Sequence, residues 1–234
     1  MARFARVIAV NVAHHATQRG NARQFILEGD ADREVYLDLL REGILRYQAS
    51  LIGYCLMSNH VHLVMIPSQA DALARTLKHT HGGYAAYWNA KQSSSGHVWQ
   101  GRYYSCPLDD ADLWAALRYA ELNPVRAGLV EAAEDWIWSS AAVHCGADAD
   151  GWLAMDEWRA RWPGLSWREY LHSEESETET MALRQYTHTG RPLGSKEFVQ
   201  GLEETAQRTL APKKGGRPAT AAKDDRQTEI VFVE

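Results

Sequence analysis

The stretch from Leu51 to Ile66 reads LIGYCLMSNHVHLVMI. Its two halves, 51–57 and 60–66, are rich in residues that favour strands, and only Ser58-Asn59 separates them. A polar connection of two residues is typical of a tight hairpin, and Pro67 ends the second half because a proline cannot donate to the strand ladder. The stretch therefore predicts two antiparallel strands.

The residues before this hairpin predict a strand followed by a helix. Val7 to Val12 is rich in β-prone residues and runs towards a turn marked by Gly20 and Asn21. Asp30 or Asp32 can then cap a helix, because apolar residues follow at the 3.6-residue period. These apolar positions are Tyr36, Leu39, Leu40, Ile44 and Tyr47.

The residues after the hairpin continue the alternation of helices and strands. A second helix is expected over 71–91, an edge strand around 103–105, and a third helix from Asp109 or Asp110 that stops before Pro124. The resulting order βαββαβ, with one more helix, favours the α+β class. It predicts a ferredoxin-like antiparallel sheet with helices on one face.

After Val130 the sequence becomes rich in tryptophan and then acidic. We predict a domain boundary after residue 146. Residues 147–234 would form a mostly helical or irregular C-terminal extension. Within it the acidic run 173–180 suggests a linker, residues 195–209 a short helix, and the end of the chain a basic disordered tail. The tryptophans between 136 and 167 are expected to pack in the core rather than to stack on bases.

The overall composition limits the class of protein. The chain has 234 residues, of which 45% are hydrophobic, and its formal net charge is -5. A core of ordinary size is expected, and no apolar run approaches the roughly 18 residues of a membrane span, so we predict a cytoplasmic protein with no membrane partner. The three cysteines form no CxxC pair. Because the chain is acidic, a nucleic-acid site would have to be a local basic patch.

The second half of the hairpin carries a candidate metal site. Side chains alternate on a strand, so His60 and His62 point to the same face and their imidazoles can converge on one ion. His79 and His81 have the same spacing, but they fall on a predicted helix, where residues two apart diverge. We therefore expect the second pair to be inert. A hydrogen-bonded strand pair without metal remains the alternative for the first.

A second candidate lies on the third predicted helix. Tyr119 and Asn123 are four residues apart, so the phenol and the amide share one helix face. A tyrosine oxygen can act as a covalent nucleophile, and an amide oxygen is a suitable ligand for magnesium or manganese. A tyrosine beside the core and an asparagine that ends a helix are the plainer interpretation.

These segments together resemble a known family. The residues that carry the resemblance are Tyr54-Cys55-Leu56-Met57-Ser58-Asn59-His60-Val61-His62-Leu63, Trp99-Gln100-Gly101-Arg102, and Arg118-Tyr119 with Asn123-Pro124-Val125-Arg126-Ala127-Gly128-Leu129-Val130. In order and spacing they are similar to the HUH-type single-strand insertion-sequence transposases, and more specifically to the REP-associated tyrosine transposases of bacteria. The resemblance runs from about His14 to His144, and more loosely includes 189–194.

The resemblance implies a role for each matching residue. His60 and His62 would be metal ligands, Asn123 a third ligand, and Tyr119 the nucleophile that forms a 5'-phosphotyrosine. Some relatives have glutamine at the Asn123 position, and Ser58 replaces a proline frequent in the hairpin turn of the family. Residues 1–146 would be the catalytic domain, with magnesium or manganese as cofactor.

The implied partner is single-stranded or hairpin DNA of the palindromic kind. Candidate phosphate contacts are the arginines that flank the motifs and the basic residues of the tail, although any of them can simply be solvated. These candidates are Arg19, Arg23, Arg102, Arg126, Lys213, Lys214 and Arg217. Both a monomer and a homodimer are compatible with the resemblance.

Three other functions stay open at this point. A replication initiator or relaxase would share the histidine pair and the nucleophile, although this chain has no GxxxxGK phosphate loop. A zinc hydrolase would use water in place of Tyr119, and the chain has no HExxH motif. A DNA-binding protein that kept the fold without catalysis is the third.

Overall fold

The computed structural model describes residues 6–148, 151–162, 164 and 166–210. A four-stranded antiparallel sheet with strand order β2-β3-β1-β4 forms its centre. The strands are β1 (His14–Arg19), β2 (Ala49–Leu56), β3 (His60–Pro67) and β4 (Tyr104–Pro107). The predicted hairpin is confirmed as β2 and β3, and the predicted edge strand is confirmed as β4.

The first strand lies later in the chain than its apolar pattern predicts. Strand β1 is His14–Arg19, not residues 7–12. The backbone of Asn11 has a φ of 61°, so the chain turns there and cannot continue as an extended strand. His14 and His15 are buried in the strand because hydrogen bonds satisfy their rings; His14 Nδ1, for example, lies 2.8 Å from the Val12 carbonyl oxygen.

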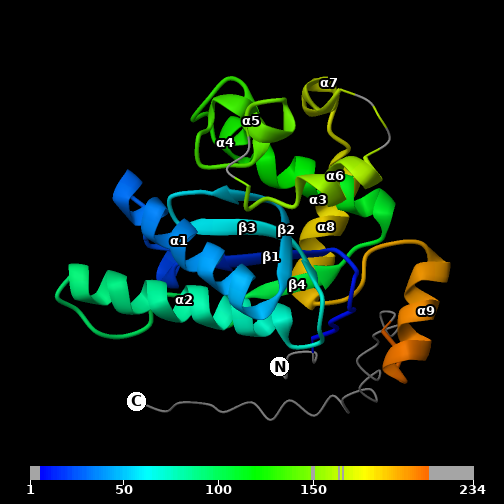
Figure 1. Ribbon diagram of the computed structural model, residues 1–234, viewed down its shortest axis with the longest axis horizontal. Helices are drawn as coiled ribbons and strands as arrows, with labels where there is room; N and C mark the ends of the chain where they lie inside the picture. The colour runs from blue at the N-terminus through cyan, green and yellow to red at the C-terminus, as the bar shows by residue number, and fades with distance from the viewer. Residues whose placement is uncertain (1–5, 149–150, 163, 165, 211–234) are drawn as a thin grey trace, which may run out of the picture.

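Two helices cover one face of the sheet. Helices α1 (Asp30–Tyr47) and α2 (Ala72–Lys91) lie side by side, and both contact β2 (Figure 1). Helix α1 begins where predicted, because the Asp32 carboxylate accepts a hydrogen bond from the Gly29 amide at 3.1 Å. The α+β class and the ferredoxin-like sheet are confirmed. The expectation that the helices lie on one face is wrong, because a third helix, Asp110–Glu121, packs against the other face.

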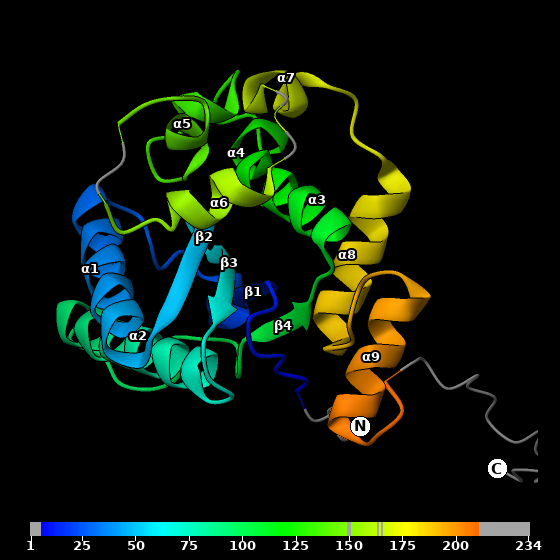
Figure 2. The same cartoon turned by 45° about the vertical axis from the view of Figure 1, so that its right-hand side comes forward.

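Helix α3 (Asp110–Glu121) packs against β2, β3 and β1 on the side of the sheet away from α1 and α2 (Figure 2). Its start is confirmed, since the Asp109 side chain accepts from the Asp112 amide at 3.0 Å. Gly53 of β2 lets the helix approach closely, because a Cβ there would lie 2.3 Å from Leu117 Cδ1. A further turn, α4 (Asn123–Arg126), follows and contains Pro124.

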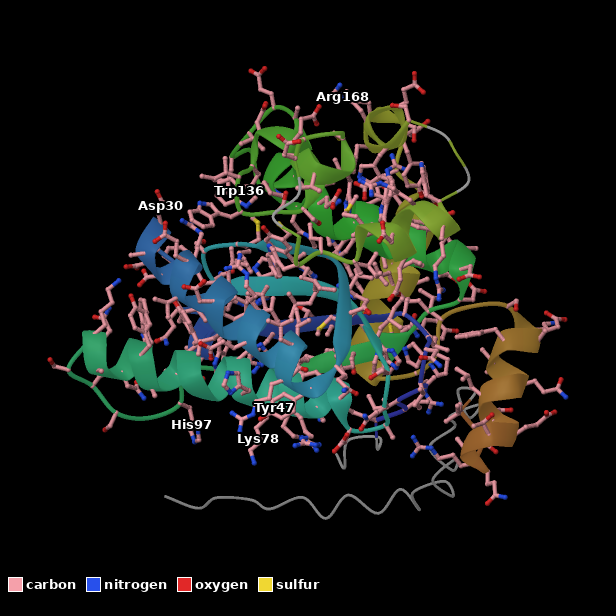
Figure 3. The ribbon with its side chains drawn as sticks, viewed as in Figure 1. Asp30, Tyr47, Lys78, His97, Trp136 and Arg168 are labelled. Carbon is pink, nitrogen blue, oxygen red and sulfur yellow. The ribbon has the colours of Figure 1, made fainter. Side chains whose placement is uncertain are left out.

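Short helices and turns complete the fold around this sheet. Trp158, Trp162 and Trp167 pack with one another and with Trp114 of α3. Trp136, labelled in Figure 3 beside the start of α1, donates from Nε1 to the Leu56 carbonyl at 3.1 Å. Packing of the tryptophans in the core is confirmed. The elements are the 3-10 turns η1 (Asn21–Arg23) and η2 (Ala133–Asp135) and the helices α5 (Ala141–His144), α6 (Met155–Arg161) and α7 (Trp167–His172).

The acidic run 173–180 differs from the linker that its composition suggests. Helix α8 (Glu177–Thr189) begins inside it, because the Ser176 side chain accepts from the Glu179 amide and two glutamates occupy the first turn. Helix α8 packs against β4 and α3, and therefore joins the C-terminal part to the sheet (Figure 2). The predicted short helix is confirmed as α9 (Lys196–Ala206). The division after residue 146 stays a prediction.

Among the residues that the structure describes, no helix has the length and apolar character needed to span a bilayer.

Candidate functional site

Two histidines of β3 converge on the side of the sheet that faces α3. The ring centroids of His60 and His62 lie 5.0 Å apart and the rings are nearly perpendicular, at 85°. Val61 between them is fully buried in the opposite layer, as the alternation of the strand requires. The two rings share one face of the strand, as its alternation predicts, and their role as metal ligands stays a prediction. His79 and His81 do not converge on a site: His81 Nε2 lies 3.1 Å from the Tyr36 hydroxyl, and His79 Nε2 lies 3.2 Å from a Glu42 carboxylate oxygen.

Both β3 histidines use the same ring nitrogen for contacts with neighbouring side chains. His60 Nδ1 lies 2.7 Å from the Asn59 side-chain oxygen, and His62 Nδ1 lies 2.9 Å from His15 Nε2. The Nε2 atoms are therefore the ones suited to a metal ion, which at His60 would replace the hydrogen bond to the Asn123 side chain. An imidazole that binds metal through one nitrogen and hydrogen-bonds through the other is the usual arrangement.

Tyr119 and Asn123 face this pair from α3 and its end. The Tyr119 ring stands edge-on to His62 with a centroid distance of 5.4 Å. Asn123 Nδ2 donates to the carbonyls of Tyr119 at 2.9 Å and Ala120 at 3.2 Å. The amide nitrogen is thus satisfied within the helix, and the Asn123 side chain also hydrogen-bonds to His60. The contact with His60 therefore falls to the amide oxygen, which is also the atom that could bind a metal ion.

The three side chains fit a divalent ion with an incomplete protein shell. Two neutral imidazoles and one amide oxygen leave coordination positions open for water or phosphate. Among residues 6–148, 151–162, 164 and 166–210 there is no group of three or more His, Cys, Asp or Glu that could hold a metal. A closed zinc site of strong ligands is therefore not found in this part of the chain.

Burial keeps the two imidazoles neutral. Burial, and next the positive charge of Arg19, lower the pKa of His60 to about 4. Burial holds the pKa of His62 well below its usual range, and the neighbouring His60 and His15 act in the same direction. A neutral imidazole has a lone pair to offer a metal, whereas a protonated one does not.

Helix α8 adds residues that the sequence analysis missed. Arg184 Nε donates to the Tyr119 phenolic oxygen at 3.0 Å, and Thr187 Oγ1 lies 2.8 Å from His15 Nδ1. His188 stacks on Tyr104 at 4.7 Å between centroids. The cap pattern Ser176-Glu177-Thr178-Glu179 could have predicted the helix. No local pattern indicates that this helix packs against the site.

These residues line one open pocket. Its walls come from β1, β3, β4, α3 and α8, so the catalytic candidates and the C-terminal part share a single cavity. The lining residues are His15, Thr17, Gln18, Arg19, His60, His62, Gln100, Tyr104, Tyr119, Asn123, Arg184, Thr187 and His188.

The arginines predicted to hold DNA fall into different settings. Arg19 lines the pocket, and Arg23 is exposed on η1. Arg102 is exposed at the end of the Trp99–Arg102 segment and is not among the residues that line the pocket. Arg126 lies over the Tyr119 ring at 4.4 Å and pairs with both carboxylate oxygens of Glu175 at 2.7 and 2.9 Å. Its contacts therefore stabilise the site itself. Lys213, Lys214 and Arg217 lie outside the described residues.

Comparison with known proteins gives consistent matches. Residues 9–123 match the family described as IS200-like transposases. A protein of Haemophilus influenzae that carries the name REP-associated tyrosine transposase is 28% identical over 105 residues, which are 40% of this chain and 60% of that protein. The chain thus spans less than two thirds of this relative.

Solved structures agree with this match at the level of the fold. A REP-associated tyrosine transposase bound to a REP hairpin superposes with a TM-score of 0.52 at 17% identity, over 71% of this chain and 93% of the other. A transposase structure from Deinococcus radiodurans matches at 16% identity over 55% of this chain and 92% of the other, and its TM-score of 0.35 is too low to support an argument. Residues 9–123 therefore match the IS200-like transposase family, and the chain is similar to a REP-associated tyrosine transposase in sequence and shares the fold of another.

Proposed function

We propose that the protein cleaves and rejoins single-stranded DNA at hairpin sites by a metal-assisted transesterification through Tyr119. The observation that carries this proposal is the position of one tyrosine against a histidine pair. The Tyr119 ring centroid is 5.4 Å from that of His62, and Asn123, the first residue of α4, donates from its amide to the Tyr119 carbonyl at 2.9 Å. A nucleophile and three suitable ligands thus line one open pocket.

The proposed ligand set is His60, His62 and Asn123, holding magnesium or manganese. When bound, such an ion would polarise a phosphoryl oxygen and stabilise the charge that develops during displacement. His60 and His62 supply neutral Nε2 atoms, and their Nδ1 contacts hold the rings in place.

Tyr119 would attack the scissile phosphorus in line with the leaving 3'-oxygen. The bond from the phenolic oxygen to phosphorus forms, the bond from phosphorus to the 3'-oxygen breaks, and the proton lost by the phenol is balanced by one gained, through solvent, at the new 3'-hydroxyl. The product is a 5'-phosphotyrosine. Attack by another 3'-hydroxyl reverses the same steps and joins a new strand, so no nucleotide cofactor is required.

Arg184 and Arg19 would hold the negative charge of the substrate. Arg184 contacts the phenolic oxygen directly, and Arg19 lies on the same pocket wall as His60. Fixed positive charges around a reacting phosphate stabilise its transition state without reorganising. A hairpin substrate is proposed because the similar solved transposase is bound to a REP hairpin.

A denaturing gel tests the proposal. Labelled single-stranded palindromes from DNA near the gene would be incubated with the protein and magnesium or manganese. The wild type is expected to give a protein-linked DNA band that requires the ion. Tyr119→Phe should abolish the band, whereas Tyr104→Phe, which changes another tyrosine of the same pocket, should retain it.

The result that would contradict the proposal is hairpin binding without any covalent band, across several palindromes and both ions. That outcome would favour a DNA-binding protein on the same fold without catalysis.

A further inference from the structure

A chain of hydrogen bonds runs from helix α8 to one of the proposed metal ligands. Thr187 Oγ1 lies 2.8 Å from His15 Nδ1, and His15 Nε2 lies 2.9 Å from His62 Nδ1. The planes of the two imidazole rings are nearly parallel, at 6°, and their centroids lie 5.1 Å apart, as an in-plane hydrogen bond between two rings requires. Three elements, α8, β1 and β3, thus meet in one line of polar atoms.

The side chains that form this row of hydrogen bonds are shielded from solvent. His15, His62 and Thr187 are only 2%, 5% and 3% exposed. Each buried ring nitrogen therefore depends on its protein neighbour for a hydrogen bond. Cys106 Sγ, 3.2 Å from the Thr187 hydroxyl, closes the far end of the chain.

Which atoms donate and which accept in these hydrogen bonds follows from what a metal ligand requires. A neutral imidazole has one N–H, so a ring that offers Nε2 to an ion must carry its proton on Nδ1. His62 Nδ1–H then donates to His15 Nε2. Because that atom accepts, His15 carries its proton on Nδ1 and donates to the Thr187 hydroxyl oxygen.

We propose that His15 and Thr187 are positioning residues that hold His62 in the tautomer and orientation needed to bind a divalent ion through Nε2. This inference rests on the proposed function, because it takes His62 as a ligand. It extends the site beyond residues 9–123, the range of the family match, since Thr187 belongs to α8. Groups that orient a ligating histidine typically change metal affinity by about 10- to 100-fold when they are removed.

Metal binding without DNA is the first measurement. Titration of the full chain with Mn²⁺, followed by electron paramagnetic resonance of the free ion, gives the affinity independently of cleavage. Thr187→Val keeps the shape of the side chain but removes the hydroxyl, and it should weaken Mn²⁺ binding about 10-fold. Thr187→Ser restores the hydroxyl and should recover most of the affinity. Thr189→Val is the matched control, because this threonine of α8 is exposed and its hydroxyl donates to the Tyr186 carbonyl, away from His15.

A spectroscopic measurement separates positioning from general damage to the fold. Nitrogen-15 shifts of the His62 ring in the metal-free protein should show the proton on Nδ1 in the wild type. Thr187→Val and His15→Phe should reduce that population, while Thr187→Ser and Thr189→Val should preserve it.

The outcomes distinguish this inference from the function on which it rests. A wild-type protein that binds no Mn²⁺ would overturn the proposed metal site, and the inference with it. A wild type that binds Mn²⁺ while Thr187→Val and His15→Phe bind it equally well, with the His62 tautomer unchanged, would overturn the positioning role alone.

Discussion

Arg184 Nε donates a hydrogen bond to the Tyr119 phenolic oxygen across 3.0 Å, although the two residues are 65 positions apart in the chain. The contact joins α8 to α3. It holds the positive charge of the Arg184 guanidinium beside the oxygen that is proposed to attack DNA.

Replacement of Arg184 should slow strand cleavage more than it weakens hairpin binding. Arg184→Met removes the charge beside the reacting oxygen, and loss of one such donor typically lowers the rate by about 100-fold or more. Single-turnover formation of the covalent band measures the effect. Arg159→Met is the control, since Arg159 pairs with Asp156 at the surface and its side chain is 65% exposed. Equal rates for the two variants would exclude a role of Arg184 in the reaction.

Gly53 should tolerate no side chain. A Cβ at this position would lie 2.3 Å from Leu117 Cδ1 and 2.7 Å from Ser140 Oγ, so Gly53→Ala must displace these two buried side chains. We expect a loss of about 1–3 kcal/mol in the free energy of unfolding, the usual cost of overpacking.

Gly82→Ala provides the matched comparison. Gly82 lies inside α2, and a Cβ there would meet no atom within 4 Å. This change should raise the free energy of unfolding by about 0.5–1 kcal/mol, because alanine favours a helix interior. Urea unfolding measures both variants, and a Gly53→Ala protein as stable as the wild type would contradict the close packing of α3.

Glu121 should stabilise the helix that carries Tyr119. Its fully buried carboxylate accepts hydrogen bonds from Ser140 at 2.5 Å and Trp167 at 2.7 Å, and His144 Nδ1 lies 2.6 Å away. Glu121→Gln places an amide group among donors and should cost about 1–3 kcal/mol of unfolding free energy, the penalty for an unsatisfied buried polar group. Glu131→Gln, at an exposed position, should change little. A neutral effect at Glu121 would show that these contacts do not stabilise the fold.

Stability should fall in mild acid because of buried histidines. Burial lowers the pKa of His81 from 6.5 to about 3. Between these values the unfolded chain binds a proton that the folded chain does not, so stability is complete above pH 6.5 and is lost as the pH falls towards 3. Each such residue contributes a slope of about 1.4 kcal/mol per pH unit in this window.

Urea unfolding at several pH values below 6.5 measures this slope. His81→Gln should reduce the slope of the unfolding free energy against pH by roughly one proton's contribution, about 1.4 kcal/mol per pH unit. Above pH 6.5 the slope should be unchanged. An unchanged slope in His81→Gln would contradict the assignment of a neutral, buried His81.

Local patterns were sufficient for the parts of the fold and site that depend on neighbours in sequence. The hairpin follows from two β-prone runs around Ser58-Asn59, and the convergence of His60 and His62 follows from strand alternation. The Asp109 cap and the contact between Asn123 and the Tyr119 carbonyl, four residues before it, follow from helical geometry, although α3 ends at Glu121 and Asn123 begins α4.

The parts that were missed depend on contacts between distant segments. The apolar run 7–12 looked more like a strand than His14–Arg19, because nothing local shows that two histidines will be buried and hydrogen-bonded. The acidic run 173–180 looked like a linker, although Ser176 is a good helix cap. The role of α8 in the site depends on packing against β4 and α3, which sequence periodicity does not encode.

Mass spectrometry of the covalent complex tests the central claim most directly. The protein would be incubated with a hairpin substrate and manganese, treated with nuclease and trypsin, and the nucleotide-bearing peptide sequenced. We predict a nucleotide linked through its 5'-phosphate to Tyr119, and none in Tyr119→Phe. A nucleotide attached to a different residue, or a cleaved strand with a free 5'-phosphate and no linked peptide, would contradict Tyr119 as the nucleophile.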